Sequence, residues 1–215
     1  MSGIVRLRRR DLMLGAGAAL LTPPALAAGK PRLVVTPGQT EGPFYPVSYP
    51  ADIDNDLVRV AGRAAEAMGQ VTHIVGRVLD RRGEPVRGAE VEIWQCDANG
   101  VYNHPGQPGL QRRDAAFQGY GRMPVDTDGS YNFRTIRPVA YPGRTPQIHF
   151  KVNAPDVGRL TTQMYVAGER RNAADGLLNA IRNAAQRRSV IVRLEPARGL
   201  EPDALQGTFD IVLDI

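Results

Sequence analysis

Two polar side chains, Gln147 and His149, stand in the stretch RTPQIHFKV, which runs from residue 144 to residue 152. From Gln147 to residue 152 polar and apolar side chains alternate, which is the period of a half-buried β-strand. Because residues i and i+2 of a strand project from the same face, Gln147 and His149 are expected to point to the same side. Such a pair can bind one ion or ligand together, or it can belong to a row of side chains that faces solvent.

Two tyrosines beside glycine and proline are the other candidates for chemistry. Tyr102 ends the stretch NGVY, and Tyr141 lies in VAYPG, shortly before the strand that carries His149. Each tyrosine taken singly is typical of a ring that covers hydrophobic surface. The sequence has no His-Glu-x-x-His motif, nucleophile elbow or phosphate-binding glycine loop. The single cysteine, Cys96, has no base near it in sequence and is expected in the core.

The other two histidines are weaker candidates. His104 follows Tyr102 by two residues in a loop-like stretch, and an outward or hydrogen-bonding role is expected for it. His73 stands in the apolar stretch THIV, which favours a hydrogen-bonded histidine within a sheet.

The elements that must position these side chains are mostly strands. Alternating or β-branched stretches between turn residues predict strands at 72–80, 89–97, 131–137, 147–152, 160–168 and 208–213. Residues 98–121 form a long loop, 126–130 a hairpin turn, and 175–188 the only convincing helix. These patterns predict one all-β domain, a β-sandwich with a minor helix and long loops around its site.

The N-terminus has the pattern of an export signal. Adjacent arginines at positions 8–10 precede a weakly apolar run at 14–21 and the small-x-small stretch ALA at 25–27. This is typical of a twin-arginine signal peptide over residues 1–27, and the apolar run is too short to span a membrane. We therefore expect an exported, periplasmic protein without a membrane-spanning segment.

The remainder divides into an arm and a domain. Residues 28–56 are rich in proline and glycine and are expected to form an extended arm, because prolines cannot serve a central strand. Residues 57–215 are expected to form the sandwich domain. The arm can pack on its own domain or on that of a neighbouring copy, which leaves a homo-oligomer open.

Charge and cysteine content exclude several classes of protein. Removing residues 1–27 takes away four arginines and one aspartate, so the formal net charge falls from +5 to +2. No basic surface large enough for nucleic acid is expected from that balance. One cysteine cannot form an intramolecular disulfide, so stability must come from packing or from a bound metal.

Four stretches carry a resemblance to a known family. They are TEGPFYP, GRVLDRRGEPVRGAEVEIWQCDANGVY, DGSYNFRTIRPVAYPGRTPQIHF and TTQMYVAGE, in this order. Together they resemble the intradiol ring-cleavage dioxygenases of the protocatechuate 3,4-dioxygenase type. The resemblance implies a β-sandwich whose non-haem Fe(III) site lies between the long loop and one sheet. It also implies an enzyme that inserts both atoms of O₂ into a catechol-like aromatic diol and opens the ring between the two hydroxylated carbons.

The family's iron is held by two tyrosinates and a His-x-His pair, and this chain departs from that pattern at one position. By resemblance the tyrosines correspond to Tyr102 and Tyr141 and the second histidine to His149, but Gln147 stands where the first histidine is expected. Hard phenolate oxygens favour Fe(III) over softer competitors. An amide oxygen is also a hard donor, so Gln147 is included in the expected metal set.

The resemblance extends to residues around the metal. Arg144 matches a family arginine that stabilises negative charge on the substrate, and Gln163 matches a glutamine of the next strand. Thr40, Gly42 and Pro43 match the part of the arm that approaches the substrate pocket.

The glutamine leaves three interpretations open. In the first interpretation, iron binds through Tyr102, Tyr141 and His149, Gln147 or water completes the site, and the activity is reduced or altered. In the second interpretation the site is abandoned, and the protein is a non-catalytic binding or partner subunit of the same fold. In the third, the glutamine is an engineered or erroneous substitution in an otherwise ordinary enzyme.

Overall fold

The computed structural model describes residues 32–50, 52–155 and 157–215, and these form two five-stranded sheets. The expected signal peptide at 1–27 lies outside the described residues. Residues 32–50 contain no helix or strand. Among the described residues, no helix has the length and apolar character needed to cross a membrane.

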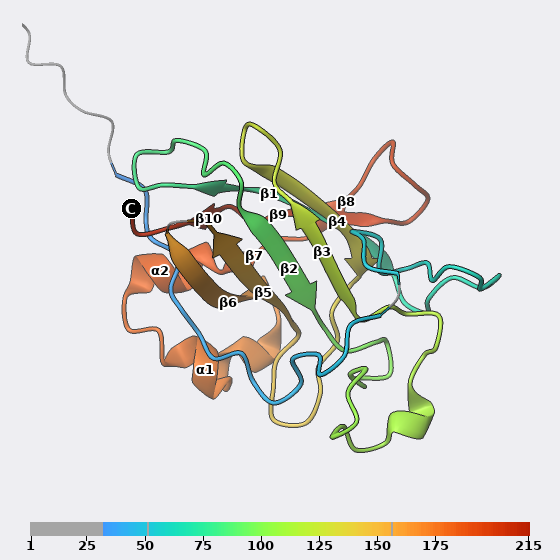
Figure 1. The fold of residues 1–215 in the computed structure, drawn as a ribbon. Coiled ribbons are helices and arrows are strands. Elements are labelled where there is room, and N and C mark those ends of the chain that lie inside the picture. Colours follow the sequence, from blue (N-terminus) through green and yellow to red (C-terminus); the bar gives the residue numbers. More distant parts are fainter. Residues whose placement is uncertain (1–31, 51, 156) are drawn as a thin grey trace, which may run out of the picture. The chain divides into compact units, whose positions relative to one another are not determined.

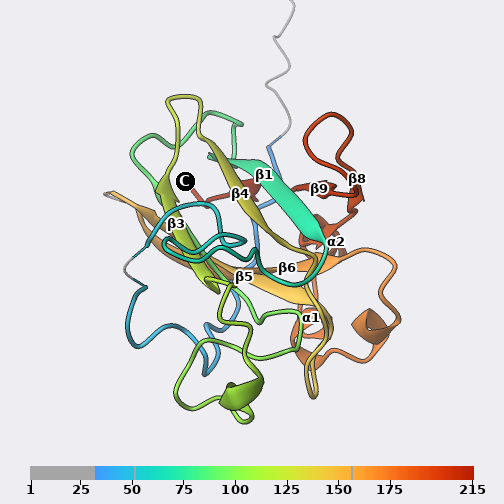
Figure 2. The same cartoon turned by 90° about the vertical axis from the view of Figure 1, so that its right-hand side faces the viewer.

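The first sheet is built around β1 (Val71–Leu79), which pairs antiparallel with β4 (Ser130–Ile136) and parallel with β9 (Leu205–Thr208) and β10 (Ile211–Val212). The short strand β8 (Glu195–Pro196) extends it beyond β9. The second sheet has the order β3 (Tyr120–Pro124), β2 (Glu90–Trp94), β5 (Gln147–Ala154), β6 (Gly158–Val166) and β7 (Ile191–Val192). Figures 1 and 2 show the two sheets as separate layers.

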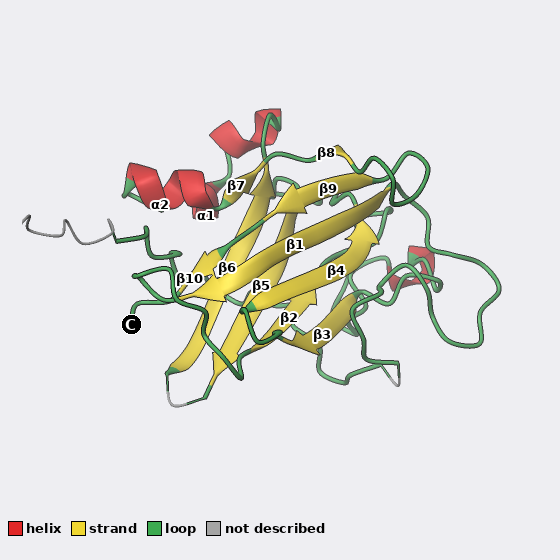
Figure 3. Cartoon of the chain, turned by 90° about the horizontal axis from the view of Figure 1, so that it is seen from above, coloured by secondary structure: helices red, strands yellow, loops and turns green. Residues whose placement is uncertain are grey.

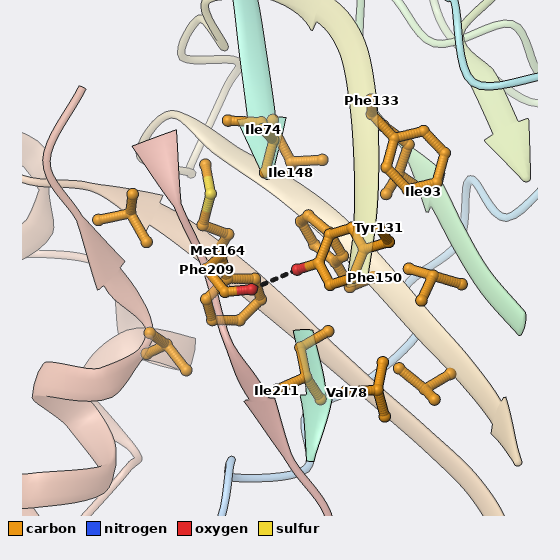
Figure 4. Packing of buried hydrophobic residues seen from close by; sticks show 14 of the residues in the cluster. Ile74, Val78, Ile93, Tyr131, Phe133, Ile148, Phe150, Met164, Phe209 and Ile211 are labelled. Atoms are coloured by element: carbon orange, nitrogen blue, oxygen red, sulfur yellow. Dashed lines mark hydrogen bonds between the residues drawn. The ribbon is translucent and has the colours of Figure 1, made fainter. Parts of the chain in front are cut away.

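The core lies between these layers and explains the alternation along the strands. Ile148, Phe150 and Val152 of β5 are buried in the main hydrophobic cluster, together with residues of β1 and β4 such as Ile74 and Phe133 (Figure 4). Burying each of these side chains stabilises the fold by roughly 1.5–3 kcal/mol. Their burial leaves the alternate residues of β5 on the outer face of the second sheet. The predicted all-β sandwich is therefore confirmed.

The turn at residues 126–130 does not make a hairpin, and that prediction was wrong. The backbone N–H of Gly129 donates to the carbonyl of Asp126 at 2.9 Å, and Gly129 has a φ of 79°, so the local reversal is present. However, β3 pairs with β2 and β4 pairs with β1. The turn residues determine only the reversal, whereas the partner of each strand depends on which sheet buries its apolar face.

The expected helix at 175–188 is divided into two short helices. Helix α1 (Gly176–Asn179) is capped by the side chain of Asp175, and α2 (Ala184–Ser189) by that of Asn183. An N-cap residue has non-helical backbone angles, so a second cap inside the apolar pattern begins a new helix. Both helices lie beside the end of the second sheet near β7 (Figure 3). The expected final strand at 208–213 is interrupted, because only Thr208, the last residue of β9, and Ile211–Val212 of β10 lie in strands.

Two connections without regular strands meet at one end of the sandwich. The connection from β2 to β3 contains only the short 3₁₀ helix η1 (Leu110–Arg112), as expected for a long loop. Figures 1 and 2 show this loop and the β4–β5 connection at the same end of the two sheets. Because Tyr102 is in the first segment and Tyr141 in the second, the fold brings the two tyrosines together.

Candidate metal centre

The outer face of β5 carries Gln147 and His149 side by side, and both are buried, with 1% and 3% of their surface exposed. His149 pairs across the sheet with Trp94 on β2 and with Gln163 on β6. The indole ring of Trp94 stacks on the imidazole, with ring centroids 4.8 Å apart and planes at 13°. This packing restricts the orientation of the His149 ring.

The long loop places Tyr102 over this face. The carboxylate of Asp97 accepts hydrogen bonds from the backbone N–H groups of Asn99 and Val101 at 2.9 and 3.0 Å. These bonds close a tight turn immediately before Tyr102, whose ring is buried. The Tyr102 ring lies 5.4 Å from that of Tyr141 and 6.1 Å from that of His149, measured between centroids.

Tyr141 reaches the same place from the β4–β5 connection and is partly exposed. Its hydroxyl oxygen accepts a hydrogen bond from Gln147 Nε2 at 3.2 Å and a longer one from Arg144 Nη1 at 3.5 Å. The structure therefore brings together all four expected ligands, Tyr102, Tyr141, Gln147 and His149.

Three of these four side chains have buried polar atoms without a partner in the protein. They are the hydroxyl of Tyr102, Oε1 of Gln147 and Nδ1 of His149. Tyr102 and Tyr141 interact electrostatically, but no hydrogen bond joins their hydroxyls. A buried polar atom without a partner costs about 1–3 kcal/mol, so three of them on side chains that meet here indicate a site for a group that the protein does not itself supply.

The protonation of these groups suits a metal ion. Burial, and then the positive charge of Arg144, lowers the pKa of His149 to about 3, so its imidazole is neutral near pH 7 and offers a lone pair. Burial raises the pKa of Tyr102 well above its ordinary value, and the nearby Cys96 and Tyr141 add to this effect. Tyr102 is therefore protonated until a cation displaces its proton.

The donor set, two phenol oxygens, one imidazole nitrogen and one amide oxygen, fits a hard trivalent ion such as Fe(III). Gln147 fits less well than an imidazole would, because its amide nitrogen rather than its oxygen faces Tyr141. No group of three or more His, Cys, Asp or Glu side chains that could hold a metal occurs in the part of the chain that the structure describes.

Arg144 and Gln163 lie next to this centre and contact each other. Arg144 Nη2 donates to Gln163 Oε1 at 2.6 Å, and Arg144 Nε donates to the buried carboxylate of Asp175 at 2.8 Å. Burial by itself raises the pKa of Asp175, but hydrogen bonds from Arg144, Leu178 and Thr145 outweigh it and hold the pKa below its usual value. Asp175 is thus an anion that orients the guanidinium. This role was not predicted from the sequence, although Asp175 is the first residue of the helix predicted at 175–188, where a capping side chain is common.

The arm contributes the remaining expected residues. Gln163 Nε2 donates to the backbone carbonyl of Thr40 at 3.1 Å. Gly42 has a φ of 76°, and a Cβ at this position would lie 3.6 Å from Cε1 of His149. Pro43 follows and is exposed. Phe44 was not predicted, yet its ring stacks on that of Tyr102 with centroids 5.0 Å apart.

The weaker candidates lie outside the centre or serve its packing. Nδ1 of His104 accepts a hydrogen bond from the backbone N–H of Gly106 at 3.0 Å, which is the hydrogen-bonding role expected for it. His73, on the inner strand β1 of the other sheet, forms a 2.7 Å contact with Glu201. Cys96 is buried, as expected.

Comparisons with known proteins agree with the geometry of the centre. A family model described as "Dioxygenase" matches residues 40–215. The protocatechuate 3,4-dioxygenase beta chain of Burkholderia cepacia is 38% identical over 179 residues, which cover 80% of this chain and 76% of that one. A hydroxyquinol 1,2-dioxygenase of Corynebacterium glutamicum is 32% identical over 147 residues, covering 60% of this chain but 45% of the relative.

A solved structure gives the same result. The dioxygenase domain of a dioxygenase–carbohydrate-binding protein fusion from Streptomyces sp. SirexAA-E has a TM-score of 0.65 and 32% sequence identity. The match covers 85% of this chain and 99% of that domain.

Proposed function

Because this chain belongs to the intradiol ring-cleaving dioxygenases, we propose that its centre binds Fe(III) and cleaves a catechol-like aromatic diol with O₂. The observation that carries the proposal is the meeting of Tyr102, Tyr141 and His149 around buried polar atoms that have no partner in the protein. The relatives are named for protocatechuate, hydroxyquinol and catechol, and each of these compounds has an aromatic ring with adjacent hydroxyl groups. The proposed substrate class is taken from that shared feature.

The two tyrosines, His149 and Oε1 of Gln147 would hold the ion. When bound, ferric iron supplies a Lewis-acidic and redox-active centre for the diol and O₂. Two phenolates also offset much of the ion's charge, which reduces the cost of burying it. Rotation of the Gln147 amide would bring its oxygen toward Tyr141, at the loss of the hydrogen bond that its nitrogen now donates.

The residues beside the iron would handle protons and charge. The oxygen of Tyr141 accepts hydrogen bonds from both Gln147 and Arg144, which would stabilise it as a phenolate beside the ion, and its partial exposure leaves it open to an incoming diol. Arg144, held by Asp175 and Gln163, presents a fixed cation to negative charge that develops on the substrate. The arm residue Gly42, which has no side chain, leaves the backbone close to His149.

A non-catalytic subunit of the same fold is not favoured, because the tyrosines, His149 and Arg144 are all present and assembled. Nothing in their packing requires a phenol at Tyr102, whose hydroxyl has no partner.

The proposal is tested by adding Fe(III) to the purified metal-free protein. Tyrosinate-to-iron charge transfer should give a broad visible absorption, and O₂ uptake should follow addition of catechol or protocatechuate. In Gln147→His the iron affinity should rise by about 10- to 100-fold, the size of effect typical of ligand-supporting groups. A colourless wild-type protein that does not retain Fe(III) contradicts the proposal. Unchanged iron affinity in Gln147→His contradicts the place of Gln147 at the metal.

A further inference from the structure

The arm segment 40–45 covers the candidate metal centre, and it has further attachments outside the centre. They are made by Glu92 and Lys151, which face each other across β2 and β5. This pair is next to Trp94 and His149, the pair of the same two strands that borders the centre. We propose that Glu92 and Lys151 are positioning residues, which hold the segment 40–45 over the centre and thereby set substrate binding.

Glu92 holds the end of the segment through Tyr45. Glu92 as a whole residue is only 5% exposed. Oε2 accepts hydrogen bonds from the hydroxyls of Tyr45 at 2.7 Å and Tyr120 at 3.2 Å, and Oε1 accepts one from Asn153 Nδ2 at 2.6 Å. A buried carboxylate is tolerated only when it is hydrogen-bonded, and Tyr45 is the one of these three donors that belongs to the arm.

Lys151 holds the segment at two further points. Its ammonium group forms an ion pair with Glu41 and lies 3.4 Å from the ring centroid of Tyr45. The Lys151 side chain is 11% exposed and that of Glu41 is 42% exposed, so solvent screens the ion pair in part and the contact with the Tyr45 ring less. Glu41 and Tyr45 flank the residues that cover the centre, so the ammonium group of Lys151 holds both ends of that stretch.

The residues between these two anchors touch the centre directly. Gly42 borders His149, and Phe44 stacks on Tyr102 with an interplanar angle of 23°. Tyr45 packs edge-on against Trp94 at 5.0 Å, and Trp94 in turn stacks on His149. A displacement of Tyr45 therefore acts on the centre by two routes, through the neighbouring Phe44 and through the Trp94 ring.

Gln163 holds the other end of the segment, because it binds Thr40 from within the centre. Loss of Glu92 or of the Tyr45 hydroxyl should free the segment at its far end and leave the metal-binding side chains in place. The centre would then lose one wall of its substrate pocket. Substrate affinity should fall more than the rate of the chemical step, because the groups that act on the substrate are unchanged.

Glu92→Gln and Tyr45→Phe test the inference, with Glu90→Gln as the matched control. Glu90 lies on the same strand and face, is half-buried, and forms only a loose 3.5 Å contact with Arg122. Amide hydrogen exchange over residues 41–45 should be about tenfold faster in both test variants, as expected for a locally released segment, and unchanged in the control. Tyr45→Phe keeps the ring and removes only the hydroxyl, so it remains informative should Glu92→Gln fail to fold.

The chain has a single tryptophan, Trp94, whose fluorescence provides a second measurement that requires neither iron nor substrate. Its fluorescence should change in Tyr45→Phe and Glu92→Gln and not in the control. In the iron-loaded enzyme, KM for the diol should rise about fivefold or more while kcat changes by less than about twofold.

The kinetic test rests on the proposed function, whereas the hydrogen-exchange and fluorescence measurements do not. A protein without dioxygenase activity but with a released segment would contradict the proposed function and leave the anchoring intact. Exchange and fluorescence that match those of Glu90→Gln in both test variants would overturn the inference. So would an equal loss of kcat and of kcat/KM, because that result places the defect in the chemical step.

Discussion

Replacing Tyr102 with phenylalanine should make the metal-free protein more stable while removing its ability to bind iron as a coloured complex. The ring of Tyr102 is buried and packed against Phe44, and phenylalanine preserves that packing. The hydroxyl, in contrast, is buried without a hydrogen-bond partner in the protein. The variant therefore keeps the packing of the ring and avoids the free-energy cost of burying the hydroxyl.

The structure gives the size of the effect. An unsatisfied buried hydroxyl costs about 1–3 kcal/mol, and part of this is recovered by rotation or by a trapped water, so we expect a gain of about 1–2 kcal/mol. For a domain of this length that corresponds to a rise in Tm of about 2–8 °C. A tyrosine with a structural hydrogen bond would change stability in the opposite direction.

Tyr131 provides that comparison within the same chain. It is also buried, and its hydroxyl donates to the backbone carbonyl of Phe209 in the core (Figure 4). Tyr131→Phe should therefore lower the free energy of unfolding by about 1–2 kcal/mol, because a buried carbonyl loses its donor.

Both variants are measured by urea unfolding of chelator-treated protein, followed by Fe(III) titration in the visible range. Tyr102→Phe should be more stable than wild type and lose most of the charge-transfer absorption, whereas Tyr131→Phe should be less stable and keep it. A clear destabilisation of metal-free Tyr102→Phe would show that its hydroxyl has a structural partner. Retention of the full absorption would show that Tyr102 does not bind the ion.

Two further predictions concern groups that support the fold. Asp175→Ala should lower the free energy of unfolding by about 3–5 kcal/mol, because it removes the cap of α1 and leaves the mostly buried Arg144 without its anion. Asn183→Ala, which removes only a helix cap, should cost about 1 kcal/mol in the same urea titration, and equal losses would contradict the importance of the ion pair. Hydrogen bonding to Arg134 outweighs burial and lowers the pKa of Glu201 to about 2, so its contribution is present above its ordinary value near 4.5 and lost as the pH falls toward 2. Because Glu201 is partly exposed, we expect about 1 kcal/mol, and the slope of stability against pH in this window should decrease in Glu201→Gln.

The sequence alone was sufficient for the class of fold and for the face of the strand that carries the site. The alternation from Gln147 to Val152 predicts which residues of β5 enter the core, because one face of the strand must be buried. The four matching stretches predict the family, which the comparisons confirm. The division of the helix at Asn183 was in principle readable, since asparagine is a common cap.

The tertiary structure determined the strand pairing and the long-range contacts, which short stretches of sequence do not contain. The pairing of β3 with β2 rather than β4 follows from burial across the whole sandwich and not from the turn at 126–130. The contact of Asp175 with Arg144 joins residues 31 positions apart, and that of Tyr45 with Glu92 joins residues 47 apart. Neither pair leaves a periodic signal, because a hydrogen bond between distant residues depends on how the elements pack. The sequence therefore determined which side chains are available at the centre, and only the packed sheets and loops determined which of them are oriented, buried and left without a partner.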